Sequence, residues 1–466
     1  MHVIDSYKNL PKKFYHENKP TEFDLAQFIK LNHDLLNELD VTLNEEDLLH
    51  YFNGSKSLQG YTAKSLAYSG HQFGYFNPSL GDGRAHIIAE VISKNSQHFD
   101  IQLKGSGRSQ FSRNGDGLSA LGPVLREFLV SEFMHQLGVP STRSLAAIAT
   151  NEKVYREDEL AGGVLVRVAN SHIRVGSFEY FYARGDFDAL NELYQYVQKR
   201  HYSNLDTELN VFKEIAKRKV KLVTKWLGVG FIHGVMNTDN TSVAGITIDY
   251  GPCAFMDEFK RNKVFSSIDR QARYAYNNQM NIALWNLSVL ANAMMPLFIK
   301  SSTETQVIEV LKEFFKDLEI YADELYLKYF AKKLGIFDPV KEDRKLIEDF
   351  LNILENESLD FTNSFRNLNS FNFSNNEWLN QWKERLKIQN KSDDEVIKLM
   401  DSVNPYLIAR NHHIEEAINL AYEGDFSYFH FLNQAYSHPY IENKEYSKLT
   451  QAPTNEQRVY QTFCGT

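Results

Sequence analysis

The sequence predicts an α+β fold with two lobes, because strand-like segments come first and helical segments follow. A mostly apolar run at 87–92 and an alternating apolar–polar run at 99–104 flank a polar turn, which is typical of a β-hairpin. Apolar residues at helical spacing then begin after Pro123 and end at Gly138, which indicates a helix within the strand-rich part. From about residue 170 onward the pattern is mostly helical, and this half is expected to form the larger lobe.

Four parts of the chain are expected from this order of elements. The divisions are residues 1–65, 66–165, 166–460 and 461–466. The first part looks mostly helical and polar, and we expect it to pack onto the lobes as an extension. The second is the smaller lobe, with two further strands expected at 145–149 and 163–168. The third is the larger lobe, in which the run 244–248 resembles a strand, and the fourth is a short tail.

Composition narrows the possible function classes. A hydrophobic fraction of 43% and an aromatic fraction of 13% allow a large core. The net charge of −9 argues against non-specific nucleic-acid binding, which needs a basic surface. The first residues show neither the apolar region of a signal peptide nor a transit-peptide pattern. The apolar run 282–299 contains Asn286, Asn292 and Pro296, so we expect a buried helix rather than a membrane span. The expectation is a cytoplasmic protein with no nucleic-acid or membrane partner.

The segment 233–251 reads HGVMNTDNTSVAGITIDYG and groups oxygen-bearing side chains around the expected strand. Asn240 and Asp249 offer an amide and a carboxylate oxygen, which are ligands that Mg²⁺ accepts. Asp239 is placed to act as a base that deprotonates an attacking hydroxyl. His233 is expected to orient the loop backbone. Asn and Asp also bond their own backbone in turns, and taken alone the segment slightly favours that simpler interpretation.

The spacing of these residues is similar to a kinase pattern with one change. Small-molecule kinases of the aminoglycoside phosphotransferase type carry H-G-D-x-x-x-x-N, followed by an Asp after a short strand. His233 and Asn240 keep that spacing, but Val235 stands where those kinases have their catalytic Asp. A displaced base beside metal ligands suggests altered chemistry on a nucleoside triphosphate.

An upstream set of residues follows kinase order. A loop with Gly81, Gly83 and Arg84 precedes the first hairpin strand, and Lys104 ends the second. In kinases a glycine-rich loop covers the phosphates and a strand Lys contacts them, although these glycines do not match the usual motif. Glu127 lies early in the next helix, where the helix dipole alone would favour an acid. With Lys104 before it, we expect an ion pair.

Several longer motifs resemble the selenoprotein O family of kinase-like protein adenylyltransferases. They are LKGSGRSQFSRNGDG at 103–117, RVANSHIRVGSFE at 167–179, and HGVMNTDN with DYGPCAFMD within 233–257. The resemblance implies a two-lobed protein-kinase-like fold with helical N- and C-terminal additions. It also implies transfer of AMP from ATP to Ser, Thr or Tyr hydroxyls of proteins. In that family ATP is bound in a flipped orientation, with its α-phosphorus facing the acceptor.

The resemblance assigns roles position by position. Asp239 would be the base, and Asn240 and Asp249 would hold Mg²⁺ or Mn²⁺. Glu127 would orient Lys104. The nucleotide and its phosphates would be bound by Gly81, Gly83, Arg84, Lys104, Asp116, Gly117, Arg167, Arg174 and Asp249. Extra arginines would suit a reversed triphosphate, since the planar guanidinium pairs well with phosphate oxygens.

The two cysteines are Cys253, four residues after Asp249, and Cys464, third from the end. By composition alone, one buried thiol and one idle tail thiol would be expected. Some members of the resembled family carry selenocysteine at the antepenultimate position. The resemblance therefore implies a reversible Cys253–Cys464 disulfide that ties the tail near the active site.

Other functions stay open at this point. Transfer of UMP from UTP is a variant of the same chemistry, because contacts to phosphate and metal do not read the base. An ATP-dependent kinase, or a nucleotide-binding scaffold without activity, are the alternatives from other classes. Retention of Lys104, Glu127, Asp239, Asn240 and Asp249 together argues against a scaffold, which has no need of metal ligands.

Overall fold

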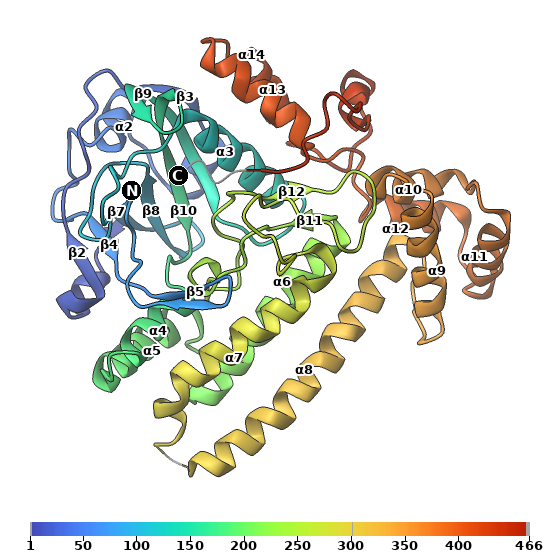
Figure 1. The fold of residues 1–466 in the computed structure, drawn as a ribbon, viewed down its shortest axis with the longest axis horizontal. Helices are drawn as coiled ribbons and strands as arrows, with labels where there is room; N and C mark the ends of the chain where they lie inside the picture. The colour runs from blue at the N-terminus through green and yellow to red at the C-terminus, as the bar shows by residue number, and fades with distance from the viewer. Residues whose placement is uncertain (1, 301, 463–466) are drawn as a thin grey trace.

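The computed structural model describes residues 2–300 and 302–462, and it contains a large antiparallel sheet beside a set of long helices (Figure 1). The sheet has the strand order β2-β4-β7-β8-β10-β9-β3, and β1 also pairs with β7. Its strands are β1 (His2–Ile4), β2 (Tyr15–Glu17), β3 (Gln27–Leu31), β4 (Lys64–Leu66), β7 (Ala85–Ile92), β8 (His98–Lys104), β9 (Arg143–Tyr155) and β10 (Glu159–Ala169). The prediction of an α+β, kinase-like fold with two lobes is confirmed.

The N-terminal part corrects the expectation of a mostly helical extension. Its α-helices are the short α1 (His33–Glu38) and α2 (Glu45–Phe52), while β1 to β4 join the large sheet. β3, for example, pairs with β9 so that Phe28 faces Ile148. Strands of three to five residues are too short to show alternation, and their pairing partners lie far along the chain, so periodicity could not reveal them.

The predicted hairpin and helix are both present in the smaller lobe. β7 and β8 pair directly, and α3 (Leu121–Gln136) packs on β9 and β10. Leu125, Phe128 and Phe133 of α3 are completely or almost completely buried. The helix is followed by Gly138 with a φ of 72°, a left-handed conformation that suits glycine.

A second, small hairpin lies at the junction with the helices. It consists of β5 (Gly70–Gln72) and β6 (Tyr75–Asn77), and it contacts α4 and the short helix η3 (Thr238–Asn240). The two turn residues, Phe73 and Gly74, have φ values of 52° and 87°. Positive φ at both central positions is the geometry of a type I′ turn, which matches the twist of a tight hairpin.

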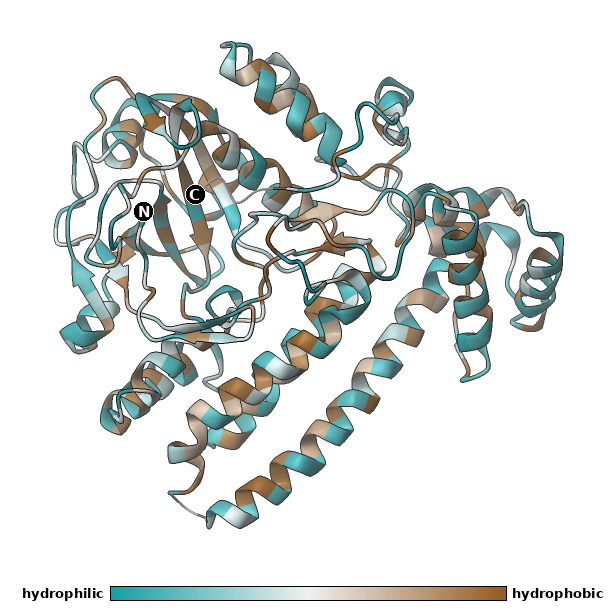
Figure 2. Cartoon of the chain, viewed as in Figure 1, coloured by the Kyte–Doolittle hydropathy of each residue, from teal (hydrophilic) through white to brown (hydrophobic). Residues whose placement is uncertain are grey.

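The larger lobe is built on five helices: α4 (Val175–Tyr182), α5 (Phe187–His201), α6 (Glu208–Gly228), α7 (Gln279–Phe298) and α8 (Glu304–Lys333). Hydrophobic residues, brown in Figure 2, are frequent along the strands of the sheet and along α7. Phe212 of α6, Leu287 of α7 and Phe314 of α8 belong to one buried cluster. The segment 276–298 is long and apolar enough to cross a membrane, and 56% of its most apolar window is buried inside the molecule.

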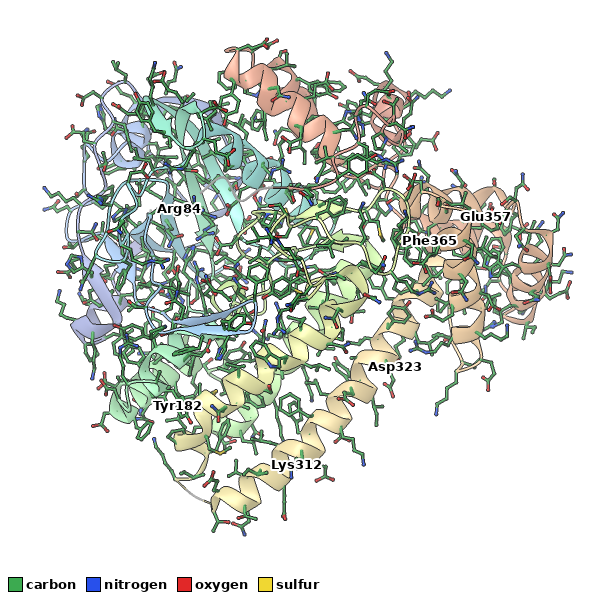
Figure 3. All side chains as sticks on the ribbon, in the orientation of Figure 1. Arg84, Tyr182, Lys312, Asp323, Glu357 and Phe365 are labelled. Atoms are coloured by element: carbon green, nitrogen blue, oxygen red, sulfur yellow. The ribbon has the colours of Figure 1, made fainter. Side chains whose placement is uncertain are left out.

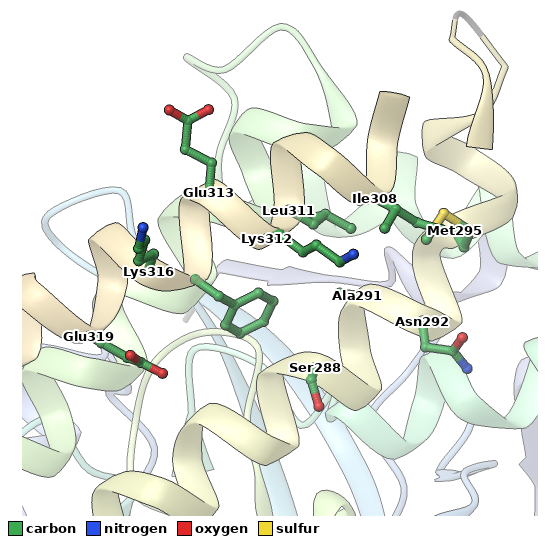
Figure 4. Close-up of a pocket in the computed structure, with 11 residues that line it drawn as sticks. Ser288, Ala291, Asn292, Met295, Ile308, Leu311, Lys312, Glu313, Lys316 and Glu319 are labelled. Carbon is green, nitrogen blue, oxygen red and sulfur yellow. The ribbon is translucent and has the colours of Figure 1, made fainter. Parts of the chain in front are cut away.

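An open groove of about 740 Å³ runs between the outer parts of α7 and α8 (Figure 4). Its lining includes the apolar Ala291, Met295 and Leu311 together with the charged Lys312, Lys316 and Glu319. Figure 3 places Lys312 and Asp323 along α8, whereas Arg84 lies in the strand-rich lobe. The groove therefore belongs to the helical lobe and not to the part that carries the predicted nucleotide residues.

The run 244–248 is not a strand, which corrects that prediction. Gly245 has a φ of 78°, and among the described residues the run forms a single β-bridge, from Thr247 to Ser141. The local pair of strands is instead β11 (Phe231–Ile232) with β12 (Ala254–Phe255). A left-handed residue in the middle of an apolar run ends any extended pairing, whatever the apolar pattern suggests.

The C-terminal helices form two groups. The first group, at the right of Figure 1, is α9 (Asp343–Asn356), α10 (Phe361–Asn367), α11 (Asn376–Ile388) and α12 (Asp393–Asp401). The second group is α13 (Asn411–Tyr422) and α14 (Ser427–Ala435), which return to the smaller lobe and pack on α3. The remaining short helices are η1 (Tyr7–Asn9), η2 (Lys12–Phe14), η4 (Tyr276–Asn278), η5 (Leu368–Ser370) and η6 (Lys444–Thr450).

Contacts between α13 and α3 are specific as well as apolar. Arg126 of α3 pairs with Glu415 of α13. The hydroxyl of Tyr422 accepts a hydrogen bond of 3.0 Å from the backbone N–H of Gly122. Beyond α14, the hydroxyl of Tyr440 donates to the carbonyl of Leu137 at 3.1 Å. The C-terminal segment therefore holds α3 at both of its ends.

Candidate active site

The site begins with a buried ion pair between the sheet and α3. Lys104 ends β8, and Glu127 lies on the face of α3 that packs toward the sheet. The Lys104 ammonium lies 2.5 Å from a carboxylate oxygen of Glu127. The predicted pair is present, and since both side chains are mostly buried it fixes the position of Lys104.

Asp249 lies at the centre of three cations. One of its oxygens is 2.8 Å from Lys104 and 2.6 Å from Arg167, and the other is 2.9 Å from Arg174. Arg167 comes from β10 and Arg174 immediately precedes α4, so three separate elements converge on one carboxylate. The structure thus brings together Lys104, Arg167, Arg174 and Asp249, which lie in three separate motifs of the sequence.

The cations determine the charge state of Asp249. Burial alone would raise its pKa, but Lys104, Arg167 and Arg174 together hold the pKa well below its ordinary value. The residue also has a φ of 65°, a left-handed conformation that is uncommon for an aspartate. This carboxylate is therefore ionised at neutral pH and held in a fixed position, as a metal ligand must be.

Asp239 has a different environment, although it lies close by in the chain. It is part of η3 and only 7% exposed, and burial raises its pKa to about 6. One carboxylate oxygen accepts a hydrogen bond of 3.2 Å from Gln72, while the other is buried without a partner among the described residues. A carboxylate whose pKa lies near neutrality is suited to accept and release a proton.

Arg174 connects the two aspartates. Its guanidinium bonds the carboxylate of Asp249 and also donates to the backbone carbonyl of Asp239, at 2.7 Å. The side chain is almost fully buried and lies 4.6 Å from the ring of Tyr68. The position of the candidate base is therefore fixed relative to the cation cluster.

Asn240 and His233 order the loop around the candidate base. The Asn240 side-chain amide donates to the carbonyl of Val235 at 3.1 Å, which leaves its amide oxygen as a possible metal ligand. His233 lies 2.9 Å from the carbonyl of Ile248 through Nε2, and the backbone N–H of Val235 lies 3.4 Å from its Nδ1. Burial lowers the pKa of His233 to about 4, so the ring is neutral and holds the backbone, as the sequence suggested.

The glycine loop is closed by a neighbouring segment. A Cβ atom on Gly81 would collide with the ring of Phe111, so glycine at this position permits close packing. The hydroxyls of Ser109 and Ser112 donate to the carbonyls of Asp82 and Gly83. Arg84 is half-buried at the start of β7. The roles of Gly81, Gly83 and Arg84 toward a nucleotide remain predictions.

Asp116 and Gly117 lie in the segment that covers this loop. Asp116 forms a two-point ion pair with Arg156, at 2.8 and 3.1 Å, and this partner lowers its pKa. Gly117 has a φ of 75° and packs directly on the backbone of Gly107. Asp116 is thus bonded to the β9–β10 hairpin and not to the cation cluster, and its contact with nucleotide stays a prediction.

Several residues of the site were not singled out from the sequence. Asp82 accepts hydrogen bonds from Gln102 and from the backbone of Leu66, and it lies 3.6 Å from Arg174. Gln102 in turn accepts from Arg167 at 2.6 Å. These are ordinary polar residues within strands and loops, and they become recognisable only when the fold places them against the arginines.

The oxygen donors fit a hard divalent cation. Asp249 offers a carboxylate and Asn240 an amide oxygen, which is the donor chemistry that Mg²⁺ and Mn²⁺ accept. Within residues 2–300 and 302–462, one group of three potential ligands lies elsewhere, at Glu90, His98 and Asp100. Arg200 already pairs with Asp100 at 2.6 Å and with Glu90 at 3.4 Å, so both carboxylates of that group have a cationic partner within the protein.

The structure describes one of the two cysteines. Cys253 is buried, with 1% exposure, and belongs to the core cluster behind α3. Cys464 lies outside the described residues. The chain leading to it is placed as far as Thr462, whose backbone N–H donates to the carbonyl of Phe265 at 2.8 Å. The Cys253–Cys464 disulfide stays a prediction.

The link between a strand lysine, a helix glutamate and an aspartate in the second lobe marks the class of protein-kinase-like enzymes. Comparison with known proteins narrows this class. A family model described as protein adenylyltransferase SelO matches residues 1–437. The chain is 43% identical over 482 residues to the protein nucleotidyltransferase YdiU of Bacillus cereus (strain ATCC 10987 / NRS 248), covering 99% of this chain and 98% of that protein.

A second relative gives the same result. The protein nucleotidyltransferase YdiU of Bacillus mycoides (strain KBAB4) is 42% identical over 480 residues, covering 99% of this chain and 97% of the relative. The chain therefore belongs to the SelO family of protein adenylyltransferases, and it is a nucleotidyltransferase by family. Use of a nucleoside triphosphate and a divalent metal follows from that membership.

Proposed function

We propose that this chain transfers AMP from ATP to Ser, Thr or Tyr hydroxyls of proteins, with the α-phosphorus of ATP facing the acceptor. The observation that carries this proposal is the double contact of Arg174. This residue bonds both Asp249, in the cation cluster, and the backbone of Asp239, the candidate base. Phosphate binding and proton removal are thereby coupled through one buried side chain.

Three cations in one buried site support the flipped orientation. Lys104, Arg167 and Arg174 could each contact phosphate oxygens when Asp249 ligates a metal. Positive groups are most effective where charge develops in the transition state, which for AMP transfer is on the departing pyrophosphate. Arginines in addition to the strand lysine suit a leaving group with several charged oxygens better than a single lysine would.

Asp239 acts as the general base in the transfer of AMP. Its carboxylate takes the proton from the acceptor hydroxyl, and the hydroxyl oxygen forms a bond to the α-phosphorus. The bond between the α-phosphorus and the oxygen bridging to the β-phosphate breaks, and pyrophosphate leaves with that electron pair. A divalent metal held by Asn240 and Asp249 would neutralise phosphate charge. Gly81, Gly83, Arg84, Asp116 and Gly117 are proposed to bind other parts of the nucleotide.

The direct test is to incubate the full chain with ATP and Mg²⁺ or Mn²⁺ and to weigh the chain and added acceptor proteins by mass spectrometry. An adenylyl adduct supports the proposal, whereas a phosphoryl adduct would show ordinary kinase orientation and overturn it. A parallel reaction with UTP decides between AMP and UMP transfer. Separate reactions with each metal decide which cation the site prefers.

The pH dependence of transfer should follow Asp239. A base must be deprotonated to accept a proton, and burial raises the pKa of this carboxyl to about 6. The rate at saturating ATP is therefore expected to rise about tenfold per pH unit below pH 6 and to level off above pH 7. Initial rates measured between pH 4.5 and 8.5 check this. A rate that stays flat down to pH 5 would mean that Asp239 is not the titrating group.

A further inference from the structure

The β5–β6 hairpin contacts the carboxylate of the candidate base directly. Gln72 of β5 donates to one oxygen of Asp239, and a Cβ atom on Gly70 would lie 2.6 Å from the other. The hairpin turn is also held in place, because the backbone N–H of Phe73 bonds Asn237 and the hydroxyl of Tyr274, both at 3.1 Å. An acceptor hydroxyl that reaches Asp239 must therefore pass beside this hairpin.

The hairpin presents aromatic side chains at its outer end. Tyr75 is 80% exposed and Phe76 is 41% exposed, so both side chains are accessible to a docked segment. The ring of His71 lies 5.1 Å from Phe76 and 5.3 Å from Trp285 at the start of α7. We call His71, Tyr75, Phe76, Trp285 and Arg273 the hairpin patch.

Arg273 gives this patch its charge. Its guanidinium lies 4.6 Å from the ring of Trp285, and a Cβ atom on Gly74, in the hairpin turn, would lie 3.6 Å from it. Within the described residues it forms no salt bridge, and its Nε and Nη2 atoms are shielded from solvent without a hydrogen-bond partner. An arginine without a carboxylate partner keeps its charge available to an anionic group that docks beside it.

We propose that the hairpin patch binds the acceptor protein, and that Arg273 selects acceptors with an acidic side chain near the modified hydroxyl. This inference rests on the proposed function. Charge complementarity identifies the occupant, because a guanidinium forms two-point, charge-assisted hydrogen bonds with the carboxylates that protein side chains offer. The chain carries a net charge of −9, so a cation at the turn of the hairpin that contacts the base provides the local attraction that an acidic acceptor needs. Tyr75 and Phe76 would supply apolar contact to the same segment.

Synthetic peptides test this selection. Each peptide contains one Tyr or one Ser flanked by Glu, Gln or Lys, and kcat/KM is measured with the full chain at saturating ATP. Peptides that are not modified are assayed as competitive inhibitors of labelling of the chain itself. Wild-type protein is expected to prefer Glu-flanked over Lys-flanked peptides by roughly tenfold or more. Equal values for both sets would overturn the proposal.

Substitutions in the hairpin patch show which residue causes the charge preference. Arg273→Gln is expected to abolish the charge preference by raising KM for Glu-flanked peptides, with KM for ATP unchanged, and Arg273→Lys should restore part of the preference. Arg270→Gln is the matched control, because this arginine is exposed and lies three residues away on the same segment. Tyr75→Ser and Phe76→Ser should raise KM for all peptides, whatever their charge.

These experiments distinguish an error in the role of Arg273 from an error in the proposed function. A charge preference that survives in Arg273→Gln would overturn the role of Arg273, while AMP transfer itself would stand. Absence of AMP transfer to every acceptor, the chain itself included, would overturn the proposed function on which the inference rests.

Discussion

Replacing Asp239 by Asn is expected to lower the rate of AMP transfer by about 10²- to 10⁴-fold, while nucleotide affinity stays within a factor of about three. Asn has nearly the same shape as Asp but cannot accept the proton of the acceptor hydroxyl. The contact of Arg174 with this residue uses the backbone carbonyl, which the substitution retains. Nucleotide anchoring should therefore persist when proton transfer is lost.

Rates measured by incorporation of labelled AMP, together with nucleotide affinity by calorimetry, check this prediction. Asp206→Asn serves as control, since this aspartate is exposed and precedes α6 outside the site. A variant of Asp239 that keeps more than about a tenth of wild-type activity would exclude general-base catalysis by this residue.

Replacing Asp249 by Asn should abolish both transfer and metal-dependent nucleotide binding. The amide is a weaker metal ligand, and transfer is expected to fall by about a thousandfold or more. The folded state should also lose about 3 kcal/mol, because Lys104, Arg167 and Arg174 would then lack the ionised carboxylate that all three contact. The two aspartates should thus give distinguishable phenotypes.

Thermal unfolding separates these phenotypes. Wild-type protein and the Asp239→Asn variant should both show a rise in Tm on addition of ATP with Mg²⁺ or Mn²⁺, because a ligand that binds the folded state stabilises it. Asp249→Asn should start at a lower Tm and show no rise with the metal-nucleotide. Equal ligand-induced shifts in all three proteins would contradict the assignment of Asp249 as a metal ligand.

The sequence could predict the parts of this molecule that depend on local pattern. The β7–β8 hairpin and α3 follow from alternation and helical spacing, and the Lys104–Glu127 pair follows from their order. The convergence of Arg167 and Arg174 on Asp249 was implied only as shared contact with a nucleotide. It could not be derived from spacing, because the three residues come from separate elements.

What the sequence could not show depends on partners that are distant along the chain. The strands of residues 2–31 pair with strands as far away as residue 149, and no window of sequence contains both partners. The sequence alone assigns no role to Gln72 or Arg273, and each gains one from a neighbour about 170 to 200 residues away, Asp239 and the hairpin turn respectively. Physical proximity, rather than residue type, identifies them.

The contacts between α13 and α3 have a consequence for the minimal catalytic unit. Helix α3 carries Glu127. The ion pair from Glu415 and the hydrogen bonds of Tyr422 and Tyr440 fix this helix, and all three residues lie after residue 410. A gene fragment that stopped before residue 404 would contain every residue assigned here to nucleotide, metal and proton, yet it would lack the support that positions Glu127 against Lys104. The C-terminal helices α13 and α14 are thus needed for a correctly positioned active site, and shortened versions made for expression should retain them.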